Sequence, residues 1–310
     1  MSHATRVGRM DMVATMATLG TLVCWSLGPL FIEYFTGYMD SWTQNALRYS
    51  LASLFWLPFL LFATARGTFD TSTWRRAILP SIPNIAMQSL WARGFYHIDP
   101  AFMTMLSKTS ILWVAGFSLI VFREERPLVQ SAQFWLGLLL SLAGLGGVIA
   151  FKDDFAAAGT LTGIAIALVQ AFMWGAYTIS VRIAFRDIDP RASFSVMSIY
   201  AAIGLSVCAA IWGKPSQIIS LDVQAWIMVL ISSVTAIALG HVFYYTAIRR
   251  IGATIPMLVI LAQPFVVFSL SSAIFHERLN GTQLLFGGVL LAGAGLSIWA
   301  QGHLRSEPPE

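Results

Sequence analysis

The chain has 310 residues, of which 57% are hydrophobic and only 11% are charged. Soluble domains carry about 25% charged residues, so this composition, with a mean hydropathy of +0.71, excludes water as the main solvent. The formal net charge is +4, but the basic residues are scattered through short loops and form no patch, so nucleic acid is not an expected partner. The two cysteines show no metal-type spacing, and no cofactor or metal is expected.

Apolar runs near the roughly 20 residues that cross a bilayer recur along the whole chain. They predict an all-α membrane protein, because lipid leaves no water to satisfy the backbone and the runs lack the alternation of barrel strands. The first run follows a basic start and is longer than a signal-peptide core. The first five predicted spans are 12–35, 42–65, 77–96, 100–122 and 131–150, and the second five are 161–184, 192–212, 226–248, 253–275 and 282–300.

The distribution of Lys and Arg predicts the orientation. With the N-terminus inside, thirteen of the nineteen fall in inside segments and four in outside loops, and basic residues are retained on the cytoplasmic side. Both termini are therefore expected in the cytoplasm. Ten spans divide at the break 151–159 into repeats 1–155 and 156–310, which enter the membrane from opposite sides. Weak sequence matches agree: Trp25 and Asp40 fall on Trp174 and Asp189 at an offset of 149 residues.

Short motifs in both halves carry a family resemblance. WSLGPLF and WGAYTIS lie in the first helix of each half, and FREERPLVQSAQFWLG and FHERLNGTQLLFGG place Glu124 or Glu125, and Glu277, after the fourth helix of each half. With these motifs the chain resembles the drug/metabolite transporter superfamily, in its EamA-like ten-helix branch. The resemblance implies a central pathway bounded by the third, fourth, eighth and ninth helices. The subgroup that the chain looks most like exports aromatic and other hydrophobic amino acids.

Polar groups inside the spans are the candidates for a substrate site, because they are costly in lipid unless they face a cavity. Lys108 lies about 12 Å below the outer end of its span, at 1.5 Å per residue. Its ammonium could attract a substrate carboxylate, or it could snorkel or cap a carbonyl. In the third span Asn84, Gln88 and Trp91 share one helical face.

The second half repeats part of this pattern. At an offset of 153 residues, Gln88 and Trp91 fall on His241 and Tyr244, and Ser110 falls on Gln263. Gln263 precedes Pro264, which can free a carbonyl. Two deep tryptophans, Trp25 and Trp174, could stack on an aromatic solute. For all of these residues ordinary helix packing remains an alternative.

These candidates predict an exporter of small amphiphilic metabolites, chiefly aromatic or hydrophobic amino acids, in the bacterial cytoplasmic membrane. Alternating access driven by the solute gradient is the expected mechanism. Proton-coupled efflux of drugs or another metabolite is the alternative, although no deep carboxylate is visible and Glu33 is the acid nearest membrane depth. An intramembrane enzyme lacks a recognisable nucleophile and base, and a channel lacks a filter.

Overall fold

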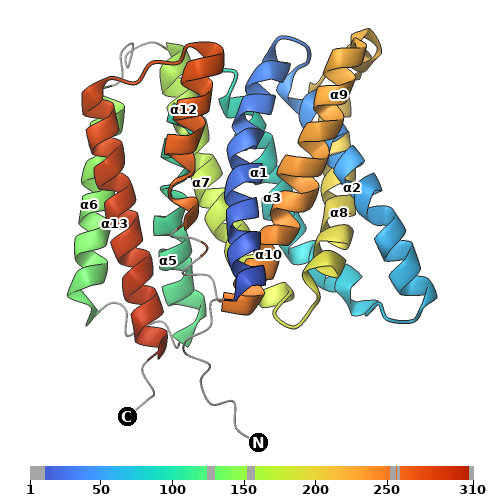
Figure 1. Ribbon diagram of the computed structural model, residues 1–310, viewed down its shortest axis with the longest axis horizontal. Coiled ribbons are helices and arrows are strands. Elements are labelled where there is room, and N and C mark those ends of the chain that lie inside the picture. Colours follow the sequence, from blue (N-terminus) through green and yellow to red (C-terminus); the bar gives the residue numbers. More distant parts are fainter. Residues whose placement is uncertain (1–10, 124–129, 152–157, 252–255, 257–258, 307–310) are drawn as a thin grey trace, which may run out of the picture.

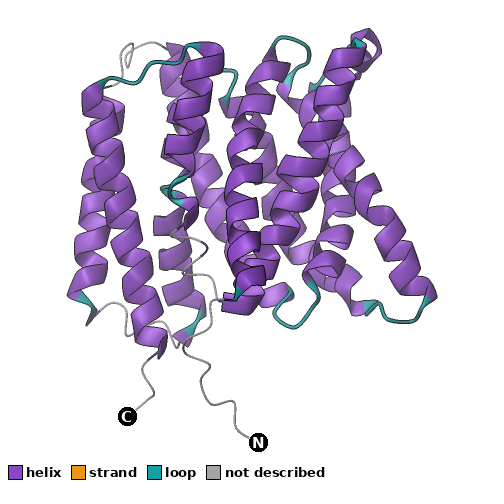
Figure 2. Ribbon diagram, viewed as in Figure 1, coloured by secondary structure: helices purple, strands orange, loops and turns teal. Residues whose placement is uncertain are grey.

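The computed structural model describes residues 11–123, 130–151, 158–251, 256 and 259–306, and these form a bundle of helices with no strand among them. Figure 2 shows the helices running between two ends, where the loops gather. The first half contains α1 (Met12–Thr36), α2 (Ser41–Ala65), α3 (Ser72–Gly94), α4 (Pro100–Ser107), α5 (Ser110–Val121) and α6 (Ala132–Ala150). The second half contains α7 (Ala158–Ala184), α8 (Pro190–Trp212), η2 (Pro215–Ser220), α9 (Val223–Ser232), η3 (Ser233–Leu239), α10 (Gly240–Ile251), α12 (Gln263–Phe275) and α13 (Gly281–Ser306).

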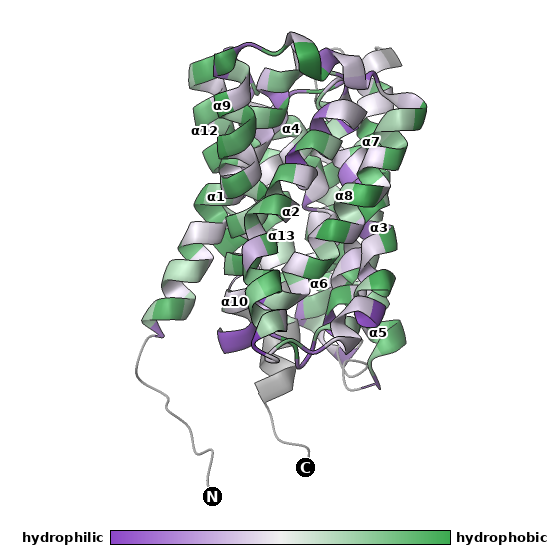
Figure 3. Cartoon of the chain, turned by 90° about the vertical axis from the view of Figure 1, so that its right-hand side faces the viewer, coloured by the Kyte–Doolittle hydropathy of each residue, from purple (hydrophilic) through white to green (hydrophobic). Residues whose placement is uncertain are grey.

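Seven helical segments in the described residues are long and apolar enough to cross a membrane, and α12 and part of α13 are shorter apolar helices. The helix α3 begins five residues before the predicted span and is the most polar of the long helices, because Arg75 and Arg76 lie in its first turns. The exposed surface carries many large apolar side chains. Figure 3 shows this apolar cover along the helices, with hydrophilic residues concentrated toward the ends, as expected of a protein solvated by lipid.

Three of the predicted spans are less regular than the sequence indicated. The fourth span is a continuous helix in the prediction but divides at Lys108 and Thr109, where Thr109 Oγ1 bonds the Leu106 carbonyl at 2.8 Å. The described part of the ninth span has a turn at residues 261–262, one repeat offset from the first break. The helix α12 starts there with Pro264 in its first turn, where a missing N–H costs least.

The eighth span contains the π-helical segment η3 between α9 and α10. Hydroxyl groups compete for backbone carbonyls in this region, since Ser233 Oγ and Thr235 Oγ1 each bond the carbonyl four residues earlier at 2.7 Å. Such side-chain bonds weaken the regular ladder. Single π-turns inside helices often occur at functional sites.

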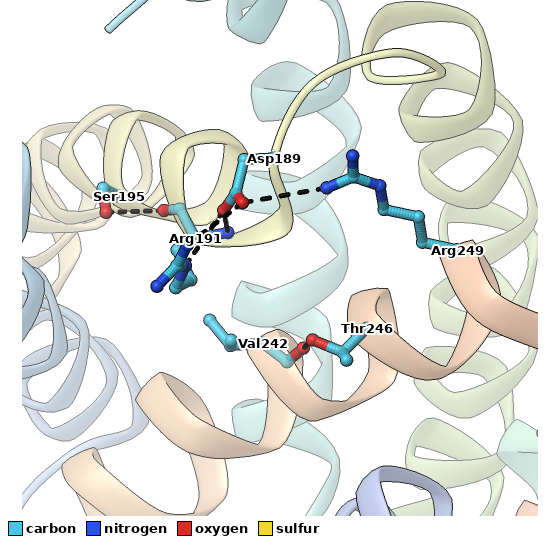
Figure 4. A network of polar contacts seen from close by, with 6 residues as sticks. All are labelled: Asp189, Arg191, Ser195, Val242, Thr246 and Arg249. Carbon is cyan, nitrogen blue, oxygen red and sulfur yellow. Dashed lines mark hydrogen bonds and ion pairs between the residues drawn. The ribbon is translucent and has the colours of Figure 1, made fainter. Parts of the chain in front are cut away.

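Two aspartates that match at the 149-residue offset have the same structural role. Asp40 caps the N-terminus of α2, and Asp189 caps that of α8. The two caps lie at opposite ends of the bundle (Figure 1). Asp189 also pairs with Arg191 at 3.2 Å and with Arg249 of α10 at 3.7 Å, which joins α8 to α10 (Figure 4).

A close glycine contact joins α6 to α13. These two helices pack along each other at one edge of the bundle (Figure 1). A Cβ atom placed on Gly144 would lie 2.3 Å from the backbone nitrogen of Leu290. The absence of a side chain at Gly144 therefore lets the backbones of α6 and α13 approach closely, as small residues do between membrane helices.

Candidate functional site

One cavity of about 110 Å³ lies at the centre of the bundle. Its wall is formed by α1, α2, α3, the α4–α5 break, α7, η3, α10 and the start of α12. Nine of the ten candidate residues border it: Trp25, Gln88, Trp91, Lys108, Ser110, Trp174, His241, Tyr244 and Gln263. The tenth, Asn84, is fully buried on α3 and does not border it. The volume is below the roughly 300–1,000 Å³ of pockets for drug-sized ligands, so the wall must move to admit more than a small solute.

Lys108 belongs to a chain of hydrogen bonds across the two halves. Its Nζ donates to Oε1 of Gln263 at 2.6 Å, and Nε2 of Gln263 donates to the backbone carbonyl of Trp25 at 2.7 Å. Gln263 aligns with Ser110 in the sequence repeat, but its hydrogen-bond partner in the first half is Lys108. The lysine neither snorkels to an interface nor caps a carbonyl, since its hydrogen-bond acceptor is a side-chain amide.

Pro29 explains why the Trp25 carbonyl is available. In a regular helix this carbonyl would accept the N–H of residue 29, and proline has none. The amide of Gln263 supplies the missing donor from another helix. A buried carbonyl without a donor is costly. Pro29 in α1 therefore favours a hydrogen bond from Gln263 of α12 to the Trp25 carbonyl.

His241 has a defined tautomer. Its Nδ1 lies 2.9 Å from the carbonyl of Ile237 in η3, and a carbonyl can only accept, so Nδ1 carries the proton. The other nitrogen, Nε2, is then an acceptor, and it has no partner among the described residues. The ring stacks on Phe194 with centroids 5.0 Å apart. His241 therefore contributes to packing as well as to the cavity wall.

Aromatic rings form the apolar part of the wall. Trp25 is 5.6 Å from Trp174 in an edge-on arrangement and 4.7 Å from Tyr244, measured between ring centroids. Trp91 contacts Phe95 edge-on at 4.9 Å. The rings come from both halves of the chain, and Trp25 and Trp174 are the pair that match at the 149-residue offset. A flat apolar solute could contact several of these rings at once.

The sequence interpretation did not select Arg48, Tyr49 or Ser107, which also border the cavity. Arg48 is only 3% exposed, and its Nε donates to Ser232 Oγ at 2.8 Å. Its depth could have been recognised, because it lies seven residues inside α2, or about 10 Å. That places it close to the depth of Lys108, and α2 and α4 begin at the same end of the bundle (Figure 1).

Glu277 is a buried carboxylate between α12 and α13. Its oxygens accept the backbone N–H groups of Ala101 at 3.1 Å and Phe102 at 3.3 Å, and the hydroxyl of Ser271. Burial raises the pKa of this carboxyl, although these hydrogen bonds oppose the rise. Glu277 thus joins the start of α4 to the end of α12. The matching residues Glu124 and Glu125 lie outside the described residues.

Comparisons with known proteins place the chain in a family. The model of the EamA-like transporter family matches residues 12–150 and again 161–299. An uncharacterised transporter from Acidianus ambivalens is 27% identical over 44% of this chain and 48% of that protein. The uncharacterised transporter YyaM of Bacillus subtilis (strain 168) is 21% identical over 86% of this chain and 88% of its own. The chain thus spans about half the length of the first relative and most of the second.

A solved crystal structure of a protein has the same fold. It superposes with a TM-score of 0.63 over 92% of this chain and 96% of the other, at 16% sequence identity, which shows the fold alone. The chain belongs to the EamA-like transporter family. It is a multi-pass membrane protein of a family that moves small molecules across the bilayer, and the relatives above are described as transporters. Among the described residues, no group of His, Cys, Asp and Glu could hold a metal ion.

Proposed function

We propose that the chain exports small amphiphilic metabolites that carry a carboxylate, with aromatic and other hydrophobic amino acids as the leading class. The observation that supports this substrate class is the central cavity, whose wall combines the Lys108 ammonium with aromatic rings from both halves. A carboxylate can bond to an ammonium with a strong, charge-assisted hydrogen bond. The rings supply contacts for the apolar side chain.

The proposed mechanism is rocking of two inverted five-helix repeats, 1–155 and 156–310, about this cavity. Two observations favour it. The family model matches twice, once on each side of the residues around 155. In addition, α1 begins and α13 ends at the same end of the bundle, whereas α7 begins at the opposite end (Figure 1). With ten spans and both termini in the cytoplasm, such repeats could open the site alternately to either side. The proposed location is the bacterial cytoplasmic membrane.

Uptake into liposomes tests the proposal. Purified protein is reconstituted, and entry of labelled phenylalanine, leucine, an organic cation and a sugar phosphate is compared with entry into protein-free vesicles. We expect saturable uptake of the amino acids and counterflow when unlabelled amino acid is placed inside. Absence of amino acid uptake, with uptake of the cation or the phosphate, would overturn the proposed substrate class.

Replacement of Lys108 by Met tests the site, because it keeps length and apolar character but removes the charge. A hydrogen bond to a charged group contributes about 1.5–3 kcal/mol, so Lys108→Met should lower uptake of phenylalanine by about tenfold or more. Uptake of phenylalaninamide, which lacks the carboxylate, should change much less. Lys214→Met, at an exposed position, is the matched control. Equal uptake of phenylalanine by Lys108→Met and the native chain would remove Lys108 from the proposed site.

Proton-coupled efflux is the second candidate, and buried Glu277 is the observation that favours it. Against it, Glu277 does not border the cavity and holds the start of α4. We expect uptake driven by the solute gradient to persist after a protonophore is added. Substrate-dependent movement of protons into the liposomes, recorded with a trapped pH-sensitive dye, would support coupling and contradict a purely gradient-driven mechanism.

A further inference from the structure

Two basic side chains, Arg48 and Lys108, border the same small cavity. Arg48 comes from α2 and Lys108 from the α4–α5 break, so they approach the cavity from different helices. A guanidinium stays protonated under any physiological condition. Arg48 therefore contributes a permanent positive charge to the wall that also carries the amine of Lys108.

Neither basic group is neutralised by a carboxylate among the described residues. Arg48 Nε donates to the hydroxyl of Ser232, and Lys108 Nζ donates to the amide of Gln263, both of which are neutral acceptors. No Asp or Glu is among the described residues that line the cavity. The buried acid Glu277 is engaged with the backbone of α4. Taking a charge out of water without a counter-charge is unfavourable, so a bound anion would supply what the protein does not.

The groups available to a ligand's ammonium are weaker. They are neutral acceptors and the faces of Trp25, Trp174 and Tyr244. Aromatic faces do attract cations, but an ammonium in this cavity also shares it with the basic groups of Arg48 and Lys108. Like charges repel strongly in a poorly solvated site, so the ammonium of a zwitterion is disfavoured in a cavity whose wall carries Arg48 and Lys108.

We propose that Arg48 and Lys108 together select ligands by net charge, so that an aromatic carboxylate without an amino group binds more tightly than the corresponding amino acid, and an aromatic amine binds most weakly. The inference rests on the proposed function, in that it assumes the cavity takes an aromatic amphiphile. It adds that the preferred substrates are organic anions and that Arg48 determines this preference.

Three ligands with one aromatic body test the order of affinity. These are 3-phenylpropionate, phenylalanine and phenethylamine, an anion, a zwitterion and a cation at neutral pH. Binding to the purified native protein in detergent is measured by isothermal titration calorimetry, with protein-free detergent as the blank. Binding is measured instead of uptake, because weak acids and amines leak through a bilayer without a transporter. We expect 3-phenylpropionate to bind about tenfold or more tightly than phenylalanine, a ratio typical of one removed charge repulsion, and phenethylamine to bind least.

Variants then test the role of Arg48. Arg48→Gln should reduce the ratio between 3-phenylpropionate and phenylalanine, and Arg48→Lys, which keeps the charge, should restore most of it. Arg66→Gln is the matched control, because Arg66 lies on the surface at the far end of α2 and away from the cavity. A ratio in Arg48→Gln equal to that of the native chain would overturn the assignment to Arg48.

The native comparison needs no variant, so it decides the charge order even where Arg48→Gln does not fold. Phenylalanine binding as tightly as 3-phenylpropionate, or more tightly, would overturn the inference and leave the proposed function standing. If neither ligand binds a protein that unfolds cooperatively on heating, the proposed function fails and the inference fails with it.

Discussion

At the residue scale, a backbone defect and a side chain from another helix complement each other. Pro29 removes the N–H that would bond to the Trp25 carbonyl, and Gln263 supplies an amide donor at 2.7 Å. The same amide presents its oxygen to Lys108 at 2.6 Å. Each of the two polar groups of the Gln263 amide has one partner. The position of the Lys108 ammonium therefore depends on Pro29, which lies in α1, a different helix.

A double-mutant cycle tests this coupling. Gln263→Leu removes the donor to the Trp25 carbonyl, and Pro29→Ala restores the helical N–H. We expect Gln263→Leu to destabilise the native chain more than it destabilises Pro29→Ala, by about 1 kcal/mol, the usual contribution of one hydrogen bond. The measurement is thermal unfolding in detergent.

Pro58, inside α2, provides the control for this cycle. The effects of Pro58→Ala and Gln263→Leu should add, because the carbonyl that Pro58 leaves without a donor belongs to α2 and not to α1. Additive effects in the Pro29 cycle as well would show that Gln263 does not replace the missing helical donor.

At the element scale, the seam between α6 and α13 depends on the absence of side chains. A Cβ on Gly144 would meet the backbone of Leu290, whereas a Cβ on Gly146, two residues away, would meet nothing within 4 Å. Helices in lipid associate through close packing and not through a hydrophobic driving force. Gly144 therefore permits the close contact between the helices, whereas Gly146 does not contribute to it, although both belong to the same motif.

Gly144→Ala should lower the stability of the fold, whereas Gly146→Ala should not. The first forces α6 and α13 apart and should lower the unfolding temperature. The second should leave it unchanged or raise it slightly, because alanine is favoured over glycine in a helix by about 0.5–1 kcal/mol. Equal effects in a thermal unfolding assay would contradict the close backbone approach at Gly144.

The cap of α2 predicts a pH dependence. Burial of Asp40 disfavours its charged form, but the hydroxyl and N–H of Thr43 and the N–H groups of Lys214 and Trp42 bond to its carboxylate and together hold the pKa below its ordinary value of 3.8. A carboxylate with a lowered pKa stabilises the fold above that value, and this contribution is lost as the pH falls through the lowered pKa.

Asp40→Asn removes this titration while keeping the shape of the cap. At neutral pH the variant should be less stable than the native chain by about 1 kcal/mol, because the amide NH2 replaces one of two oxygens that accept hydrogen bonds. Acidification below about pH 4 should then reduce the difference, because Asp40 becomes protonated in the native chain. Unfolding temperatures measured across this range check the prediction, and a difference that stays constant with pH would contradict it.

At the scale of the whole molecule, the two ends of the bundle are held differently. At the end where α1 begins, Asp11 pairs with Arg250 at 3.0 Å and Asp189 pairs with Arg249 at 3.7 Å, both on exposed side chains. At the opposite end, Asp40 accepts the backbone N–H of Lys214, and Glu277 accepts N–H groups of α4. The contacts at the two ends join different pairs of helices. A motion that opened one end of the bundle would therefore break the contacts at that end and leave those at the other end in place.

Cysteine labelling tests the orientation. In a chain with Cys24 and Cys208 replaced, Thr71→Cys lies in the connection before α3 and Ile219→Cys lies in η2 at the opposite end. With both termini in the cytoplasm, a membrane-impermeant thiol reagent should label Ile219→Cys in intact cells and Thr71→Cys only after the membrane is opened. The reverse pattern would contradict the proposed orientation.

The sequence alone determined the membrane class, the helical nature of the chain and nine of the residues around the cavity. These follow from local properties: apolar length decides what can cross lipid, and a polar group within such a segment must face the interior. Tertiary structure decided which partners those groups have. The bond from Lys108 to Gln263, the burial of Arg48 beside the same cavity and the exclusion of Asn84 from it depend on helix rotation and packing. Contacts between distant segments set these, and no single helix encodes them.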